Sequence, residues 1–361
     1  MSKISKTQIF TLIVLFEVGS TTLFAVGIKA KQDAWLAILI AMVIGWGILW
    51  MYNFIQQTYP DQHLGNILVT VLGKGLGSVL VFFYALYFLV NTSFNFWEFG
   101  EVTVLLALKE TPLEVVLLVS LLLMLYASYL GIAIIARASE IFIPYFLSFI
   151  ALIFCFVLLS GDVETARLQP VLEHGIMPVI HAAIPKVVSF PFGEVVVFLF
   201  LWHNVKEKKG LFKTSFAAIT MSGIILTCSL FLIITTLGPE SAAQRTVPLR
   251  RVTSMINIGD FIKNIDALAL MTFFIGGFFK MTLNFYACIV LIQTLFPIKK
   301  MRWILFPLGI CLFGFSLAIF PSIIFQRWLG AEVHSTYVHP LFQVIIPSLL
   351  LLVIWIKKIK T

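Results

Sequence analysis

The feature that most constrains this chain is a series of long, uninterrupted apolar runs. Ten stretches of about 20 or more mostly apolar residues follow one another, and a helix of this length can cross the hydrocarbon core of a bilayer. They occupy residues 7–28, 34–57, 76–100, 113–136, 140–160, 186–203, 211–238, 264–296, 303–326 and 338–357. Because apolar side chains surround these segments on all sides, the runs predict membrane-spanning helices rather than the amphipathic helices of a soluble protein.

The composition excludes several other classes of protein. Hydrophobic residues make up 60% of the 361 positions and charged residues 12%, whereas soluble domains have roughly 45–50% and about 25%. So few charges cannot cover a water-soluble surface, and the high hydrophobicity excludes intrinsic disorder. Long runs, in place of short alternating segments, exclude a transmembrane barrel. We therefore predict an all-α polytopic membrane protein with ten transmembrane helices in the lipid bilayer.

Most of the charged residues lie in the connections between the apolar runs. With the N-terminus inside, Lys and Arg number 14 on the cytoplasmic side and 10 on the other side. This bias predicts that both termini are cytoplasmic. The net charge of +8 is therefore expected to orient the protein in the membrane, and no nucleic-acid partner is expected. Two of the long connections, residues 57–75 and 161–185, are predicted to lie at the membrane interface.

Three ionisable residues remain inside the apolar spans: Glu17 in the first, Glu194 in the sixth and Lys280 in the eighth. A charge at the bilayer centre costs about 2.5–3.5 kcal/mol on insertion scales, so such residues usually face a protein-lined interior and often have a function. The alternative is a structural Glu–Lys pair that holds helices together. All three are candidates for proton coupling or for charge pairing.

The first and sixth spans also contain residues that interrupt helices. Span one has Gly19, Ser20 and Thr21 near its middle, and span six has Pro191 and Gly193. Proline removes a backbone donor, glycine has little helix preference, and hydroxyl side chains compete for backbone groups. Interrupted segments at corresponding places in the two halves of a chain indicate the midplane binding site of an inverted-repeat transporter. We therefore predict that helices 1 and 6 are broken.

The third span carries a polar stripe. Its members, at steps of three or four residues, are Tyr84, Tyr87, Asn91, Asn95 and Glu98. This spacing places them on one helical face. The stripe either hydrogen-bonds to neighbouring helices, at about 0.6 kcal/mol per contact, or forms one wall of a polar cavity.

One face of the eighth span combines glycine, aromatic and polar residues. The face contains Phe273, Gly277, Lys280 and Asn284. Glycine there would let another backbone or a ligand approach closely. Lys280 could neutralise Glu17 or Glu194, hold a ligand carboxylate or replace a coupling cation, and the sequence does not choose among these roles. The aromatic residues Phe190 and Phe274 are candidates for ligand selectivity.

Catalytic and metal-binding motifs are absent from the sequence. It has no P-loop, no GxSxG, no HExxH and no cluster of His, Cys and Asp at ligand spacing. The six histidines lie in predicted connections or at span ends, where a solvated or interfacial side chain is expected. We therefore expect neither an enzyme nor a cofactor or metal site.

Four segments of the sequence form a recognisable set of motifs. They are Leu168-Gln169-Pro170-Val171-Leu172-Glu173-His174-Gly175-Ile176, Phe190-Pro191-Phe192-Gly193-Glu194, Pro248-Leu249-Arg250-Arg251 followed by Ile258-Gly259-Asp260-Phe261 and Asp266-Ala267, and Phe278-Phe279-Lys280. In these motifs the chain resembles the spore germination permeases, which are the B subunits of nutrient germinant receptors in the amino acid–polyamine–organocation transporter superfamily. The resemblance extends over nearly the whole chain.

This resemblance implies a LeuT-like bundle with a five-plus-five inverted repeat. Repeat one would cover residues 1–160, an interfacial linker 161–185, and repeat two 186–361. It also implies a small nutrient ligand such as an amino acid, a membrane-anchored A subunit and a lipoprotein C subunit as partners, and a location in the inner membrane of the spore.

The leading hypothesis is a germinant-sensing subunit that binds its ligand between the breaks. The predicted ligand-binding residues are Gly19, Ser20, Thr21, Asn91, Asn95, Phe190, Pro191, Gly193, Glu194, Phe274, Gly277 and Lys280. The alternative is a secondary transporter that moves an amino acid together with a proton, carried by Glu17 or Glu194.

Overall fold

The computed structural model describes residues 3–258, 262–296, 298 and 300–359. Its helices are α1 (Lys6–Val18), α2 (Ala34–Thr58), α3 (Leu64–Leu106), α4 (Leu113–Leu130), α5 (Ile132–Leu159), α6 (Met177–Ala182), α7 (Leu211–Leu237), α8 (Pro239–Gln244), α9 (Pro248–Met255), α10 (Asp266–Leu295), α11 (Arg302–Ile319), α12 (Ile323–Trp328) and α13 (Ile346–Ile359). The short strands β1 (Asn257–Ile258) and β2 (Ile262–Lys263) pair in antiparallel fashion. Residues 259–261 of the family-like motif, and Lys299 and Lys360 of the charge count, lie outside the described residues.

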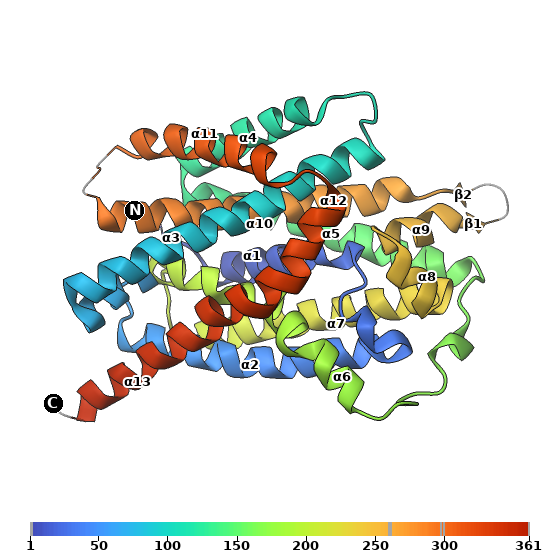
Figure 1. Cartoon of the computed structure of the whole chain (residues 1–361), viewed down its shortest axis with the longest axis horizontal. Helices are drawn as coiled ribbons and strands as arrows, with labels where there is room; N and C mark the ends of the chain where they lie inside the picture. Colours follow the sequence, from blue (N-terminus) through green and yellow to red (C-terminus); the bar gives the residue numbers. More distant parts are fainter. Residues whose placement is uncertain (1–2, 259–261, 297, 299, 360–361) are drawn as a thin grey trace.

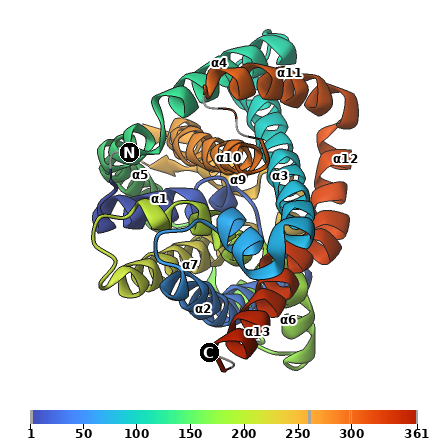
Figure 2. The same cartoon turned by 90° about the vertical axis from the view of Figure 1, so that its left-hand side faces the viewer.

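The helices form a bundle around a central group. Helix α1 packs against α5, α7 and α10, and α3 runs along α10 in the most extensive helix contact of the chain. Helices α4 and α11 pack against each other and cover α3 (Figure 2). Segment 323–359, which begins with α12 and ends with α13, crosses the bundle diagonally (Figure 1).

Nine helical segments within the described residues are long and apolar enough to cross a membrane. Each coincides with one of the predicted spans from 34–57 onward. The predicted span 7–28 differs, because α1 has only 13 residues and ends at Val18. An all-helical, polytopic membrane fold is therefore present, and its first span is not one continuous helix.

Two predicted connections were wrong, and a third contains a helix. The connection predicted at 57–75 includes the first turns of α3, which starts at Leu64 and is interrupted by non-helical backbone at Gly73 before the span that follows. The connection predicted at 137–139 lies within α5, because the chain turns earlier, at Gly131, whose φ of 87° favours glycine. Residues 327–337 are helical and continue α12 as a wider π-type helix, Leu329–Val338. Charged residues in these segments suggested loops, but an exposed or half-buried charged side chain is equally compatible with a helix.

Large apolar side chains cover the outside of the bundle. Val119 and Tyr126 on α4 are both 62% exposed, and Ile310 on α11 is 72% exposed. A water-soluble protein rarely exposes so much contiguous apolar surface. These faces are expected to contact lipid.

Two glycines let the central helices touch through their backbones. Gly19 follows the end of α1, and Gly276 lies within α10. A methyl group added at Gly276 would overlap the Cα atom of Gly19. The absence of side chains at these two positions therefore fixes how closely α10 approaches the end of α1.

The chain begins and ends at the same end of the bundle, which faces the viewer in Figure 2. Near the N-terminus, Ile4 is fully buried and pairs with Val205 in a parallel bridge. Ser5 then caps α1 in a capping box with Gln8. Close by, the rings of His63 and His203 lie 5.3 Å apart. The N-terminal segment thus connects the start of span one to the end of span six.

Candidate functional site

The first span is interrupted near its middle. Helix α1 ends at Val18, and a short 3₁₀ turn, Thr21–Leu23, follows. The hydroxyl of Thr22 donates a hydrogen bond to the carbonyl of Gly19, so a side chain satisfies a backbone acceptor that a continuous helix would have used. The chain then leaves the helical path and turns at Gly27, whose φ is 79°.

The sixth span is interrupted at Pro191. It begins as α6, widens at Ala183–Val187, turns at Phe190 and Pro191, and continues as a tight 3₁₀ helix, Phe192–Phe200. Proline has no amide hydrogen for a helical bond to the preceding turn, which explains the position of this interruption. The two interruptions leave backbone groups free of regular helical bonding near the middle of the bundle.

An ion pair joins the sixth span to α10. Lys280 Nζ lies 2.5 Å from Glu194 Oε2, and the two side chains are only 0% and 4% exposed. The ammonium group also lies 4.1 Å from the centre of the Phe190 ring and 5.2 Å from that of Phe16. Aromatic faces attract cations, so Lys280 is held by one carboxylate and two rings in a dry environment.

Glu17 lies next to this pair but forms no ion pair with Lys280. Its side chain is fully buried, and neither carboxylate oxygen has a hydrogen-bond partner among the described residues. A buried polar group without a partner is costly and uncommon in folded proteins. Of the two carboxyl groups that Lys280 was predicted to neutralise, the ammonium group lies against Glu194 and forms no ion pair with Glu17.

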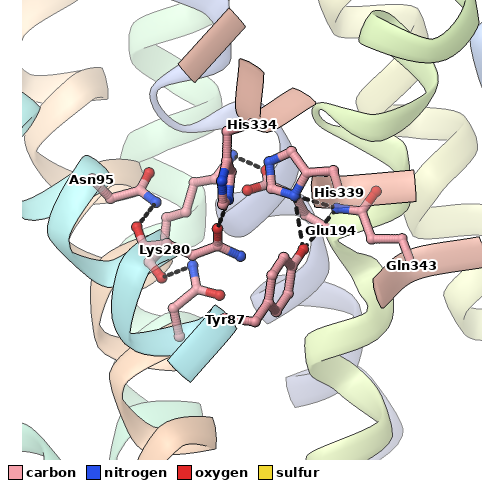
Figure 3. Close-up of polar contacts among 9 residues, drawn as sticks. Tyr87, Asn95, Glu194, Lys280, His334, His339 and Gln343 are labelled. Carbon is pink, nitrogen blue, oxygen red and sulfur yellow. Dashed lines mark hydrogen bonds and ion pairs between the residues drawn. The ribbon is translucent and has the colours of Figure 1, made fainter. Parts of the chain in front are cut away.

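A buried hydrogen-bond network connects the polar stripe of α3 to the last helical segment. His334 Nε2 lies 2.6 Å from Asn91 Oδ1, and the Tyr87 hydroxyl lies 2.8 Å from His339 Nδ1. The side-chain amide of Gln343 donates to the Tyr87 hydroxyl at 3.0 Å. Figure 3 shows Tyr87, His334, His339 and Gln343 converging beside Glu194 and Lys280. The stripe therefore makes interhelical hydrogen bonds.

The same stripe also borders a cavity, so both of its proposed roles occur together. The cavity has a volume of about 320 Å³, which suits a small ligand. Its walls come from the chain after the first interruption (residues 24–29), α3, the sixth span before and after its break, and segment 326–339. Apolar side chains such as Phe94 and Val187 alternate with polar ones.

Charged residues surround the outer part of this cavity. At its mouth, Glu332 accepts hydrogen bonds from Lys29 at 2.7 Å and from Lys186 at 2.5 Å. On its wall, Arg327 and Glu98 form a looser pair, with 3.7 Å between Nη2 and Oε1. These contacts connect four separate segments of the chain around one opening.

The predicted ligand-binding residues fall into two groups. Asn91, Asn95, Phe190 and Glu194 line the cavity. Lys280 does not, but it contacts two of those that do. The other seven lie elsewhere. Gly19 packs against Gly276, Ser20 is buried next to Gly19, and Gly193 packs against Gln343. Thr21 and Pro191 border a separate cleft of about 10 Å³, and Phe274 and Gly277 both contact the ring of Phe99.

Several cavity residues were missed from the sequence. His334 and His339 are 7% and 4% exposed, so the expectation of solvated or interfacial histidines was wrong for both. Arg327 and Glu332 had been assigned to a connection. Glu98 belonged to the predicted stripe but was left out of the site. The polar residues just before the last apolar run were the one sequence signal that could have indicated Arg327, Glu332 and the two histidines.

Comparison with known proteins identifies the family. The family model described as "Spore germination protein" matches residues 3–322 of this chain. The chain belongs to the spore germination protein family. It is similar to spore germination protein KB of Bacillus subtilis (strain 168), with 31% identity over 360 residues that cover 99% of this chain and 96% of the relative. It is therefore a B-type subunit like that relative, and an integral membrane protein of this family.

More distant relatives belong to the same group. Spore germination protein XB of Bacillus anthracis is 25% identical over 75% of this chain and 74% of its own length. Spore germination protein A2 of B. subtilis is 23% identical over 79% and 77%. The named relatives are germination proteins and not enzymes.

The fold is that of a transporter. A solved structure described as the substrate-bound outward-open state of a Na⁺-coupled sialic acid symporter superposes with a TM-score of 0.60, covering 95% of this chain and 78% of the symporter. The sequence identity is 13%, so this likeness concerns the LeuT-like fold alone.

Proposed function

We propose that this B-type subunit binds a small nutrient, an amino acid, in the cavity beside the broken sixth span, and that binding triggers germination. The observation that carries the proposal is the cavity itself, which is about 320 Å³ in volume and is lined by apolar side chains together with many polar and charged ones. Sites for small ligands typically combine these properties. Asn91, Asn95 and Glu194 would orient the ligand there.

Binding would act on the arrangement of helices. The cavity walls belong to both halves of the chain, so a ligand that fits one arrangement of these halves better than another shifts the population toward it. The backbone at Gly19–Thr21 and at Pro191–Gly193, together with Phe274 and Gly277, would then take part in the movement or in an inner position of the ligand.

The family supports further proposals about the surroundings of the subunit. We propose that residues 1–160 and 186–361 form a five-plus-five inverted repeat joined by 161–185, and that ten spans cross the membrane with helices 1 and 6 broken. Both termini would be cytoplasmic, so that the cavity opens on the outer side of the spore inner membrane. An A subunit and a lipoprotein C subunit would complete the receptor.

A stability screen of the purified protein tests ligand binding. A compound that binds only the folded state raises the unfolding temperature in a concentration-dependent manner. We expect stabilisation by at least one amino acid, and little by nucleosides or sugars. The N95L variant, which fills part of the cavity, should lose this response, whereas the control variant N53L, altered in α2 away from the cavity, should keep it. An equal response in both variants would contradict the proposed location.

Glu17 favours a second candidate function. A fully buried carboxyl group without a hydrogen-bond partner can carry a proton across a membrane in a protein with a transporter fold. The subunit would then move an amino acid together with a proton. Uptake of an amino acid by vesicles that contain this chain alone, driven by a pH gradient and abolished in E17Q, would favour transport over sensing.

A further inference from the structure

The charged groups around the cavity differ in how closely they contact a group of opposite charge. Lys280 and Glu194 form a closed contact of 2.5 Å that excludes water. Glu332 already accepts hydrogen bonds from two lysines at the mouth, where its side chain is 41% exposed. Arg327 and Glu98 are partly buried, yet the 3.7 Å between them exceeds a hydrogen-bond distance. The outer pair therefore differs from the other two sets in its separation, which leaves its charged groups further apart than a direct hydrogen bond.

The surroundings of Arg327 leave part of its guanidinium group unsatisfied. Its Nη1 donates to the carbonyl of Thr246, and its central carbon lies 4.3 Å from the centre of the Phe24 ring. The Nε and Nη2 atoms are buried and have no hydrogen-bond partner among the described residues. Leaving a charged donor desolvated and unpaired costs free energy, which an incoming acceptor would recover. Arg327 also lines the cavity, so its side chain lies beside the space that a ligand would occupy, and a small shift of the covered guanidinium would bring Nε and Nη2 to that ligand.

Glu98 provides the complementary charge on the same wall. It lies on α3, one helical turn beyond Asn95, and it also lines the cavity. A ligand that carries one carboxylate and one ammonium group can place the first at Arg327 and the second at Glu98. The planar guanidinium matches a carboxylate with two parallel hydrogen bonds, which a single ammonium group cannot offer.

We propose that Arg327 and Glu98 form the subsite for the head group of a zwitterionic α-amino acid, with the ligand carboxylate on Arg327 and the ligand ammonium on Glu98. This inference rests on the proposed function and specifies which end of the cavity recognises the ligand's charges. The ligand side chain extends inward along Phe94 and Phe190. The ion pair of Lys280 and Glu194 stays closed, because opening a dry pair would strand two charges.

Matched probes separate the two charges of the ligand. L-alanine, L-valine and L-leucine are each compared with their amides, which lack the carboxylate, and with propionate, 3-methylbutanoate and 4-methylpentanoate, which lack the amine. Dissociation constants are measured on the purified full chain. We expect each amide and each deaminated acid to bind about 10- to 100-fold more weakly than the amino acid that binds best, because each loses charged hydrogen bonds.

Variants assign each charge to its residue. In R327Q the difference between the amino acid and its amide should shrink to less than about threefold, and in R327K it should be intermediate. In E98Q the difference between the amino acid and the deaminated acid should shrink instead. The control R302Q alters an exposed arginine beside Trp303 and should leave both differences unchanged. A ratio between two probes reports recognition and not folding, so reduced stability of a variant does not confound it.

The possible failures are distinguishable. If an amino acid binds but R327Q retains the full preference for the acid over the amide, the head-group subsite is wrong and the proposed function stands. If only neutral sugars or nucleosides bind, the subsite and the proposed amino-acid ligand are both wrong. If no compound binds the wild-type chain, the proposed function fails, and this inference fails with it.

Discussion

The two acid–base pairs of the central region show opposite solutions to burying charge. The inner pair, Lys280 and Glu194, is tight, dry and enclosed by aromatic rings. The outer pair, Arg327 and Glu98, is partly exposed and too far apart for a hydrogen bond. Both lie in spans of a membrane protein, where unpaired charge is expensive. We therefore propose that the inner pair mainly connects its two spans and that the outer pair binds the ligand.

This difference also extends to the regions around the pairs. On the inner side, backbone contact between Gly19 and Gly276 and the bridge of Ile4 to Val205 close the structure. On the outer side, the cavity separates the helices. The comparison yields four predictions, arranged from the largest expected effect to the smallest.

Removing the inner cation should have the largest effect. K280M leaves Glu194 buried without its partner, and breaking a buried pair in this way costs about 3–5 kcal/mol. We expect a large loss of thermal stability or of membrane expression. The double variant E194Q/K280M removes the stranded charge and should recover part of that loss. K213M, at an exposed position, serves as the control. Wild-type stability in K280M would show that the inner pair holds nothing together.

A methyl group at the backbone contact should have the next largest effect. In G276A the new Cβ overlaps the backbone of Gly19, so α10 must move away from the end of α1. Overpacking of this kind costs about 1–3 kcal/mol. The control G314A lies in α11, where a Cβ meets no atom within 4 Å, and should be neutral or slightly stabilising. Similar unfolding temperatures for the two variants would contradict the close contact.

Acid should weaken the closed end of the molecule through a pair of histidines. Burial lowers the pKa of His63 and of His203 from about 6.5 to about 4. Below pH 6.5 the two histidines bind protons in the unfolded chain, whereas in the folded chain they stay neutral down to about pH 4. The free energy of unfolding therefore falls as the pH is lowered from 6.5 to 4.

With allowance for partial exposure, the expected loss for the pair is of order 1–2 kcal/mol. Thermal unfolding measured from pH 7.5 to pH 4 should show this slope in wild type. It should be reduced in H63Q/H203Q and unchanged in H174Q, which alters an exposed histidine. A slope that persists in the double variant would assign the acid sensitivity to other groups.

The mouth of the cavity should contribute least to stability. E332Q removes ion pairs with Lys29 and Lys186, and exposed pairs of this kind contribute about 0–1 kcal/mol. We expect a small change in unfolding temperature that disappears at high ionic strength. A loss as large as that of K280M would mean that the mouth, like the inner pair, holds the helices together.

The polar stripe of α3 shows what helical periodicity in the sequence can predict about the site. The spacing of Tyr87, Asn91 and Asn95 predicted one polar face, and that face does meet a cavity and a network. The stripe's partners, His334 and His339, were not predictable in the same way. His334 lies in the π-type helix Leu329–Val338, whose wider turn does not follow the 3.6-residue period, and His339 follows directly after it; charged neighbours suggested a loop.

The predicted breaks in spans one and six show what local sequence does not predict. Proline and glycine indicated where spans one and six would depart from a helix, and the chain does so at Val18 and Pro191. The composition of the breaks did not indicate which groups face the open volume. Eight of the twelve predicted ligand-binding residues do not line the cavity: for example, Gly19 packs against Gly276 of α10 and Gly193 against Gln343, which fill the space beside them.

The sequence by itself determined that the chain is a helical membrane protein, where most spans run and which residues carry charge into the membrane, because these properties depend on local hydrophobicity and backbone chemistry. Only the tertiary structure decided that Lys280 pairs with Glu194 while Arg327 stays loosely held beside Glu98. Charge pairing depends on ångström-scale distances between segments far apart in the chain, and no local pattern encodes those distances.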